Sequence, residues 1–300
     1  MPNVPEQFRK VAIVGPGLLG ASVGLGLKRI GYTGEILGVS RREETLQTAI
    51  ARGAIDVGSH DIAGTVGSYD LIIIATPLGA FKTVFENLAG NLKDNACITD
   101  VGSTKVSVVQ TAMQCLSDDS IRRFVPAHPM AGSEQQGPEA ATDTLLLGRP
   151  CILTPGSETA DDAVANVRSF WQAMGMNVLT LSPEEHDRKC AAVSHLPHLL
   201  AVLLSLYAKQ ENATQVASTG FRDMTRLSAS NPNIRADILD QNRQSILDAI
   251  DGFKTMLEFA HSTIQSGDND AVRQLLDDAS SFRDEWMSNF NANGREGSST

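Results

Sequence analysis

The sequence predicts an α/β protein in which residues 1–182 form a Rossmann-type, doubly wound sheet and residues 183–300 form an all-α domain. Up to about residue 181, short apolar runs typical of buried strands alternate with helical segments, as in parallel sheets covered by helices on both faces. After residue 182 these runs disappear, and apolar residues recur at helical spacing. The length of 300 residues also favours two cores over one.

The first predicted strand, residues 11–14, leads through a glycine-rich turn into an apolar helix that ends near residue 30. The turn has the G-x-G-x-x-G spacing of dinucleotide-binding proteins and reads Gly15-Pro16-Gly17-Leu18-Leu19-Gly20. Gly15 permits the tight turn, Gly17 lets the backbone approach a pyrophosphate, and Gly20 lets helix and strand pack closely. The strand–turn–helix context favours dinucleotide binding over a turn without a ligand.

The other elements of the sheet domain follow the same alternation. We expect strands at residues 35–39, 55–57, 71–75, 96–100, 124–125, 151–154 and 177–181, and helices at 43–52, 78–88, from 103 or 104, and at 161–174.

The helical domain has a clear predicted start. Ser182-Pro183-Glu184-Glu185 supplies a serine cap, a proline at the first position and acids in the first turn. The segment 199–206 is apolar on most faces and is expected to be central to this domain. From about residue 289 the chain is polar and rich in glycine, which predicts a disordered tail.

Composition excludes several classes of partner. The net charge of −10 argues against nucleic acid or an anionic membrane as the main partner. Widely separated cysteines predict buried thiols in a reducing compartment, chiefly Cys97, Cys151 and Cys190. Because no apolar signal core and no run long enough for a bilayer are found, we expect a cytoplasmic protein.

The nucleotide ribose is usually bound at the end of the second strand. That position holds Ser40-Arg41-Arg42 where NAD-binding proteins carry an acid, and guanidinium groups bind phosphate well. This favours NADP over NAD, against the alternative of a solvated helix start. A central strand ends at Ala75-Thr76-Pro77, on the side of the sheet where ligands bind.

Two further strand ends carry polar residues. Ser103 follows the strand at 96–100 and is either a plain helix cap or a group that faces the cofactor. His128 precedes Pro129, so we expect it to end its strand and to project into the crevice as a proton acceptor. A buried structural histidine is the alternative.

Four more residues lie in motifs of the helical domain. His195 and His198 are three residues apart on one helical face, around Pro197, which either starts or kinks a helix. Without matching cysteine or carboxylate spacing, no metal site is expected. Arg222 and Arg226 are one turn apart, and form either a solvated pair with Asp223 or a clamp for a substrate carboxylate. The remaining histidines have no motif around them and are interpreted as surface or helix-flank residues: His60, His186 and His261.

These motifs, in this order, resemble those of the prephenate/arogenate dehydrogenase family of tyrosine biosynthesis. The resemblance spans residues 11–285, and its most specific parts are His128-Pro-Met-Ala-Gly-Ser-Glu134, Ser194-His-Leu-Pro-His198 and Gly220-Phe-Arg-Asp-Met-Thr-Arg226. It implies NAD(P)-dependent oxidation and decarboxylation of prephenate to 4-hydroxyphenylpyruvate. The alternative is an arogenate or dual-specificity enzyme that forms tyrosine directly. It also implies a homodimer built through the helical domain, with the active site between the domains.

The resemblance also implies roles for individual residues. His128 accepts the proton of the ring hydroxyl, Ser103 hydrogen-bonds that hydroxyl, and Arg226 binds the ring carboxylate. His195 and His198 line the pocket, and Glu134 orders the substrate end of the cleft.

One stretch departs from the family pattern. Asn233-Ile234-Arg235 stands where some relatives carry a tryptophan, and Arg235 is a candidate for binding the side-chain carboxylate of the substrate. Two other classes of nucleotide-binding protein are alternatives. A 3-hydroxyacid or 6-phosphogluconate type of dehydrogenase would use a lysine, for which Lys189 is the candidate, and an NADP-sensing regulator would need no catalytic histidine.

Overall fold

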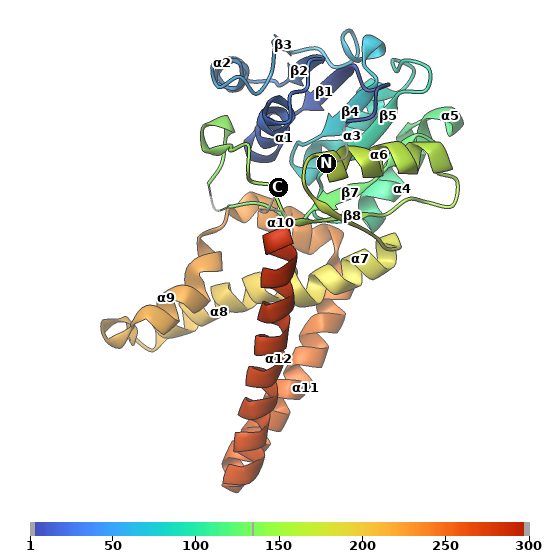
Figure 1. Cartoon of the computed structure of the whole chain (residues 1–300). Coiled ribbons are helices and arrows are strands. Elements are labelled where there is room, and N and C mark those ends of the chain that lie inside the picture. Colours follow the sequence, from blue (N-terminus) through green and yellow to red (C-terminus); the bar gives the residue numbers. More distant parts are fainter. Residues whose placement is uncertain (1–3, 134, 297–300) are drawn as a thin grey trace.

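Six parallel strands form the sheet of the N-terminal domain, in the order β3-β2-β1-β4-β5-β6 (Figure 1). The computed structural model describes residues 4–133 and 135–296. The strands are β1 (Lys10–Val14), β2 (Glu35–Val39), β3 (Val57–Ser59), β4 (Leu71–Ile74), β5 (Cys97–Asp100) and β6 (Phe124–Val125). The strand order reverses between β1 and β4, which is where open α/β sheets bind ligands. The predicted Rossmann-type sheet is confirmed.

Alternating side chains of the strands point into two separate cores. Val11 and Ile13 belong to one apolar cluster, whereas Ala12 and Val14 belong to the other. Both faces of the sheet are therefore buried, which explains why its strands are almost continuously apolar. The layers that cover them come from α1 (Leu18–Arg29), α2 (Glu43–Ala51), α3 (Phe81–Leu88), α4 (Val106–Cys115), α5 (Asp118–Ile121) and α6 (Asp161–Ala173).

The last three strands of this domain differ from the prediction. β7 (Ala127–Pro129), β8 (Pro150–Leu153) and β9 (Asn177–Thr180) form a second sheet, and β7 is antiparallel to β8. The chain leaves β6 at Pro126, which has no N–H to donate to a ladder. Ala127 is then held by the side chains of Asp100 and Lys105, which bond its N–H and its carbonyl oxygen.

The start of α4 also differs from the prediction of residue 103 or 104. The helix begins at Val106, and its first N–H groups are capped from another helix. Asp187 accepts hydrogen bonds from the N–H groups of Lys105 and Val106, at 2.8 and 3.0 Å. Ser103 is therefore not the cap of this helix, because Asp187 takes that role.

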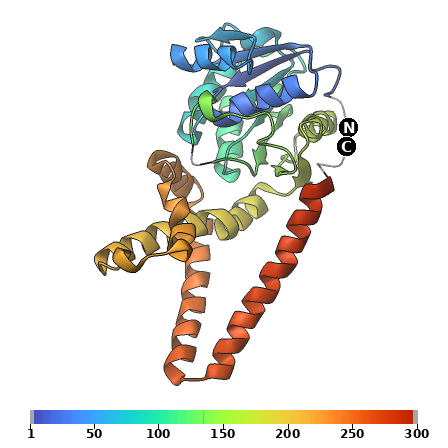
Figure 2. The same cartoon turned by 60° about the vertical axis from the view of Figure 1, so that its left-hand side comes forward.

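A long helix crosses beneath the sheet domain and opens the helical domain (Figure 2). It comprises α7 (Pro183–Cys190), a wider π-type turn (Ala191–His195) and α8 (Leu196–Gln210). Ser182 caps it by accepting the N–H of Glu185, as predicted. By length and composition alone, this helix is also long and apolar enough to cross a membrane, contrary to the prediction that no such run exists. Only 28% of its apolar stretch is buried, and Leu203 and Leu206 are exposed, so the segment 199–206 is not enclosed within this chain, although it was predicted to be central to the domain.

The remaining helices build the rest of this domain. They are α9 (Thr219–Thr225), α10 (Pro232–Gln241), α11 (Arg243–Ser266) and α12 (Asn269–Glu296). α11 and α12 form a long hairpin that extends away from the sheet domain, with Gly267 in the left-handed conformation at its turn (Figure 2).

The predicted disordered tail is helical as far as Glu296, and residues 297–300 lie outside the described part of the chain. α12 returns to the sheet domain, where the guanidinium of Arg149 lies 5.9 Å from the ring centre of Phe290. The rings of Trp286 and Phe290 also pack together. These aromatic contacts stabilise the end of α12, which was predicted to be disordered because its composition is polar.

Candidate active site

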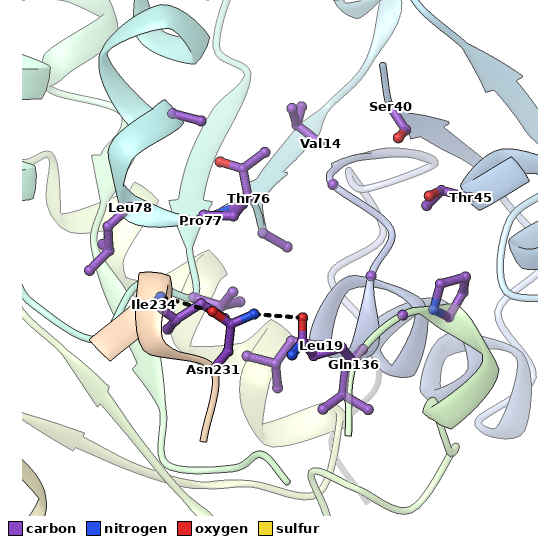
Figure 3. A pocket seen from close by; sticks show the side chains of 18 of the residues that line it. Val14, Leu19, Ser40, Thr45, Thr76, Pro77, Leu78, Gln136, Asn231 and Ile234 are labelled. Atoms are coloured by element: carbon purple, nitrogen blue, oxygen red, sulfur yellow. Dashed lines mark hydrogen bonds between the residues drawn. The ribbon is translucent and has the colours of Figure 1, made fainter. Parts of the chain in front are cut away.

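A cleft of about 1150 Å³ runs along the carboxyl ends of the central strands (Figure 3). Most of the residues predicted to bind the nucleotide line it, together with Ser103. They are Gly15, Gly17, Leu18, Leu19, Ser40, Arg41, Arg42, Ala75, Thr76 and Pro77. Pro16 and Gly20 are instead buried behind the wall of the cleft. They shape the turn rather than form its surface.

The three glycines have distinct surroundings that suit a dinucleotide. Gly15 has a φ of +93°, and a Cβ there would lie 2.8 Å from the carbonyl oxygen of Ala75. A Cβ at Gly20 would lie 2.4 Å from the carbonyl oxygen of Gly15. At Gly17 a Cβ would meet nothing within 4 Å, so the backbone opens directly onto the cleft. No side chain caps α1, which leaves its first N–H groups available to a pyrophosphate.

The ribose end of the cleft contains a histidine that the sequence analysis interpreted as a surface or helix-flank residue. Nδ1 of His60 lies 2.7 Å from the carbonyl oxygen of Ser40, and Nε2 lies 2.8 Å from Glu43. These two hydrogen bonds raise the pKa of His60. His60 lines the cleft beside Arg41 because β3 ends next to β2. Only the pairing of these strands, not a local motif, brings His60 there.

The opposite wall of the cleft comes from the helical domain. Asn231 caps α10 and donates to the side-chain oxygen of Gln136 across the cleft, at 3.0 Å (Figure 3). Ile234 and Arg235 of α10 also line the cleft. Arg235 is half-buried, which lowers the pKa of its guanidinium, and its Nε has no hydrogen-bond partner among the described residues. α10 therefore contributes a cationic side chain to the lining of the cleft.

His128 lies within β7, next to the strand's last residue, and is only 8% exposed. Its Nδ1 lies 2.8 Å from Nε2 of His186, a residue of α7. Burial, followed by the nearby His186, Lys105 and His195, holds the pKa of His128 well below its usual range. The side chain is therefore neutral near pH 7, as a proton acceptor must be.

The other two histidines of the helical domain continue this cluster. His195 has its Nδ1 3.1 Å from the amide nitrogen of Asn242, and burial lowers the pKa of His195 to about 4. His198 bonds the carbonyl oxygen of Ser194 through Nδ1, and burial lowers the pKa of His198 as well. The positive charges of Arg235 and Arg226 act in the same direction on His198. The charge effects place His195 and His198 in the same region as His128, His186 and the two arginines.

The sequence as a whole matches two family models in succession. The model described as prephenate dehydrogenase, nucleotide-binding domain, matches residues 23–180. The model described as prephenate dehydrogenase, dimerization domain, matches residues 182–278. The chain belongs to the prephenate dehydrogenase family.

Individual members of the family are similar over almost the whole chain. Cyclohexadienyl dehydrogenase of Zymomonas mobilis is 32% identical over 92% of this chain and 95% of its own length. The Aquifex aeolicus prephenate dehydrogenase, solved in complex with hydroxyphenyl propionate and NAD+, is 31% identical with a TM-score of 0.83, over 92% of this chain and 98% of that one. Arogenate dehydrogenase of Synechocystis is 28% identical with a TM-score of 0.79, over 92% and 99% of the two chains.

Membership of the prephenate dehydrogenase family makes this chain an NAD(P)-dependent oxidoreductase, and its match to the dimerization domain supports a homodimer. The exposed apolar side chains of α8 and α11 suit such an interface. They include Leu203, Leu206, Phe253 and Leu257.

His186 is the main residue of this family site that the sequence analysis missed. It was interpreted as a surface or helix-flank residue, yet it is fully buried and bonds both His128 and Asp187. The available signal was the position of His186 in the first turns of α7, between two acids and four residues before Cys190. Its contact with His128 depends on how β7 packs, which spacing does not reveal.

Several candidates are not among the residues that line the cleft. They include His128, which is buried where we expected it to project into the crevice, His195, His198, and Arg226, whose side chain is exposed. The side chain of Arg222 is 73% exposed and pairs with Asp223 at 2.9 Å, so it is a solvated ion pair in this arrangement. Glu134 lies outside the described residues. Lys189, the candidate lysine of the rival dehydrogenase class, is exposed and pairs with Glu185.

His128, His186 and Cys190 carry side chains of the kinds that bind metals, and their ligating atoms lie within 4.8 Å of one another. The two ring nitrogens are 2.8 Å apart, which is a hydrogen-bond distance. Two nitrogens on a tetrahedral zinc would be roughly 3.3 Å apart. Burial also raises the pKa of the Cys190 thiol to about 12, which disfavours the thiolate that metals require. Cys97, Cys151 and Cys190 are buried thiols, as predicted.

Proposed function

We propose that this protein is a cytoplasmic prephenate dehydrogenase that oxidises and decarboxylates prephenate to 4-hydroxyphenylpyruvate. The observation that supports this most directly is His128, a buried imidazole whose pKa is held well below its usual range, in a region that also holds His195, His198, Arg226 and the cleft-lining Arg235. Proton acceptance and anion binding are the two tasks that this reaction requires of the protein.

The residues of the chain divide these tasks. When bound, the dinucleotide accepts a hydride from the hydroxyl-bearing ring carbon. His128 takes the proton of that hydroxyl as the C–O bond becomes a carbonyl, and Ser103 donates a hydrogen bond to the same oxygen. Arg226 holds the ring carboxylate until it leaves as CO2 and the ring becomes aromatic. His195 and His198 line the pocket between these groups.

Arg235 supports prephenate over arogenate as the substrate. We assign its guanidinium to the side-chain carboxylate, which is adjacent to a keto group in prephenate and to an ammonium in arogenate. A half-buried cation attracts the keto oxygen of prephenate and repels the ammonium group of arogenate. Glu134 remains a candidate for ordering this end of the substrate.

The ribose end of the cleft supports NADP over NAD. Ser40, Arg41 and Arg42 line this end together with His60, and the two arginines supply the guanidinium groups that a phosphate requires. A 2′-phosphate gains charge-assisted hydrogen bonds from such a group.

Initial rates with prephenate and arogenate, each combined with NAD and NADP, test the proposal. We expect the highest kcat/KM with prephenate and NADP. Arg235→Gln is expected to raise KM for prephenate at least tenfold and to affect arogenate less, because only a charge is removed. An equal effect on both substrates would refute the role of Arg235, and absence of oxidation with either substrate would refute the function.

A further inference from the structure

A buried chain of three side chains connects the proposed proton acceptor to the start of α4. Nδ1 of His128 lies 2.8 Å from Nε2 of His186, and Nδ1 of His186 lies 2.7 Å from Oδ1 of Asp187. His186 and Asp187 are 0% and 2% exposed. Because water does not reach these hydrogen bonds, the neighbouring groups decide which atom of each pair carries the proton.

Asp187 determines which atom donates in each hydrogen bond between Asp187, His186 and His128. Its Oδ1 and Oδ2 accept the N–H groups of Lys105 and Val106, at 2.8 and 3.0 Å. These donors lie at the positive end of α4, where an anionic carboxylate is favoured. Since an ionised Asp187 can only accept, His186 must place a proton on its Nδ1.

The proton on Nδ1 of His186 determines the state of His128. A neutral His186 then offers a lone pair at Nε2, and His128 must donate to it from Nδ1. The remaining lone pair of His128 is left on Nε2. A doubly protonated His186 would reverse this bond and place a proton on Nε2 of His128, where it would block proton acceptance.

We propose that His186 and Asp187 are positioning residues that hold His128 as the Nδ1–H tautomer, so that Nε2 takes the proton of the substrate hydroxyl. The inference rests on the proposed function. As the O–H bond breaks, its proton binds Nε2, and the electron pair of the adjacent C–H bond leaves as the hydride. No proton moves along the chain. The new imidazolium keeps its Nδ1–H bond to His186, and the carboxylate of Asp187 stabilises the new charge.

The groups around His128 allow a matched control. Lys105 is paired with Asp100, and His195 is bonded to Asn242, so neither receives a hydrogen bond from His128. Cys190 is as buried as His186, and its sulfur lies 3.4 Å from Nε2 of His186. The same sulfur lies 3.9 Å from Nδ1 of His128. Cys190 thus contacts both imidazoles, but it makes no hydrogen bond with Asp187 that would relay the carboxylate's effect to His128.

Three variants test the positioning role in the full-length dimer. His186→Leu removes the acceptor at similar volume and is expected to lower kcat with prephenate about 100-fold, the scale of lost acid–base assistance, with KM and nucleotide Kd changed less than about threefold. His186→Gln can still accept from Nδ1 through its amide oxygen, and is expected to retain kcat within about tenfold. Cys190→Ala is expected to stay within about threefold of the wild type. Equal kcat losses in the Leu and Gln variants, or a kcat of His186→Leu near that of the wild type, would overturn the proposal.

The tautomer can be measured without activity. With 15N-labelled histidine, the six imidazoles give separate ring-nitrogen signals, and His128→Asn identifies those of His128. We expect Nε2 of His128 to be unprotonated in the wild type. Asp187→Asn offers an amide N–H to His186, which reverses the chain and is expected to protonate Nε2 of His128. A wild-type His128 protonated on Nε2 would overturn the inference even if prephenate is oxidised. Absence of prephenate oxidation with the expected tautomer would instead refute the proposed function alone.

Discussion

The two domains of this protein differ in where they bury their apolar side chains. The sheet domain packs Ile13 and Ile73 on one side of the sheet and Ile72 on the other, all completely buried within its own chain. The helical domain leaves Leu203 51% exposed and Leu257 60% exposed. The nucleotide-binding part is therefore complete in one chain, whereas the helical part requires a second copy. The buried histidines lie at the boundary between the sheet domain, whose core is complete, and the helical domain, whose apolar surface is covered in a dimer.

The largest expected effect separates chemistry from nucleotide binding. His128→Asn removes the proposed proton acceptor, and is expected to lower kcat by about 10²–10⁴-fold because acid–base assistance is lost. The sheet domain should still bind nucleotide with unchanged Kd, as measured by fluorescence titration. A normal kcat would show that the boundary histidine is not the proton acceptor.

The second test uses pH, because the boundary buries imidazoles in their neutral form. Burial lowers the pKa of His195 to about 4, whereas the unfolded chain has a histidine pKa of roughly 6.5. Between these values the unfolded state binds more protons, so stability is complete above pH 6.5 and is lost as the pH falls. The free energy of unfolding should fall by about 3 kcal/mol by pH 4 from His195 alone.

Urea unfolding at fixed protein concentration measures this loss, and His195→Gln serves as the comparison. If the variant and the wild type lose stability equally between pH 6.5 and pH 4, His195 does not carry the effect.

The third test concerns the incomplete core. Leu203→Asp places a carboxylate on the exposed face of α8, and is expected to weaken the dimer by at least about 100-fold, since a charge is costly in an apolar interface. Sedimentation should then show the 32.1 kDa chain alone. Met113→Asp, at a residue of α4 that is 63% exposed, is the matched control and should leave the dimer intact. A stable Leu203→Asp dimer would mean that another surface joins the copies.

The smallest expected effects distinguish two glycines of the complete core. Gly20→Ala should lower the free energy of unfolding by about 1–3 kcal/mol, because its Cβ would clash with backbone. Gly17→Ala should leave stability unchanged and weaken nucleotide binding about tenfold, because its Cβ would point into open space where phosphates bind. Thermal unfolding and nucleotide titration of both variants check this contrast, which fails if the two variants behave alike.

Local patterns were sufficient to predict most of the sheet domain. The strand at 35–39 and the glycine turn follow from apolar runs and from backbone freedom, which are properties of adjacent residues. The start of α4 could not be predicted, because Asp187 caps it from 81 residues away. The second sheet and the contact between His128 and His186 also depend on long-range packing. Sequence reasoning therefore found candidate residues in motifs, and missed a partner whose role arises only when β7 meets α7.

The wider turn at Ala191–His195 governs the rotational phase of the long helix. In an uninterrupted α-helix of about 3.6 residues per turn, positions nine apart such as His186 and His195 point in opposite directions. Both are buried here, because the turn of five residues retards the rotation between them. If the same residues followed ordinary α-helical winding, His195 would turn away from His186, and the leucines of α8 would rotate with it. The wider turn therefore sets the directions of both His195 and the apolar face of α8, so a change in its winding would disturb both at once.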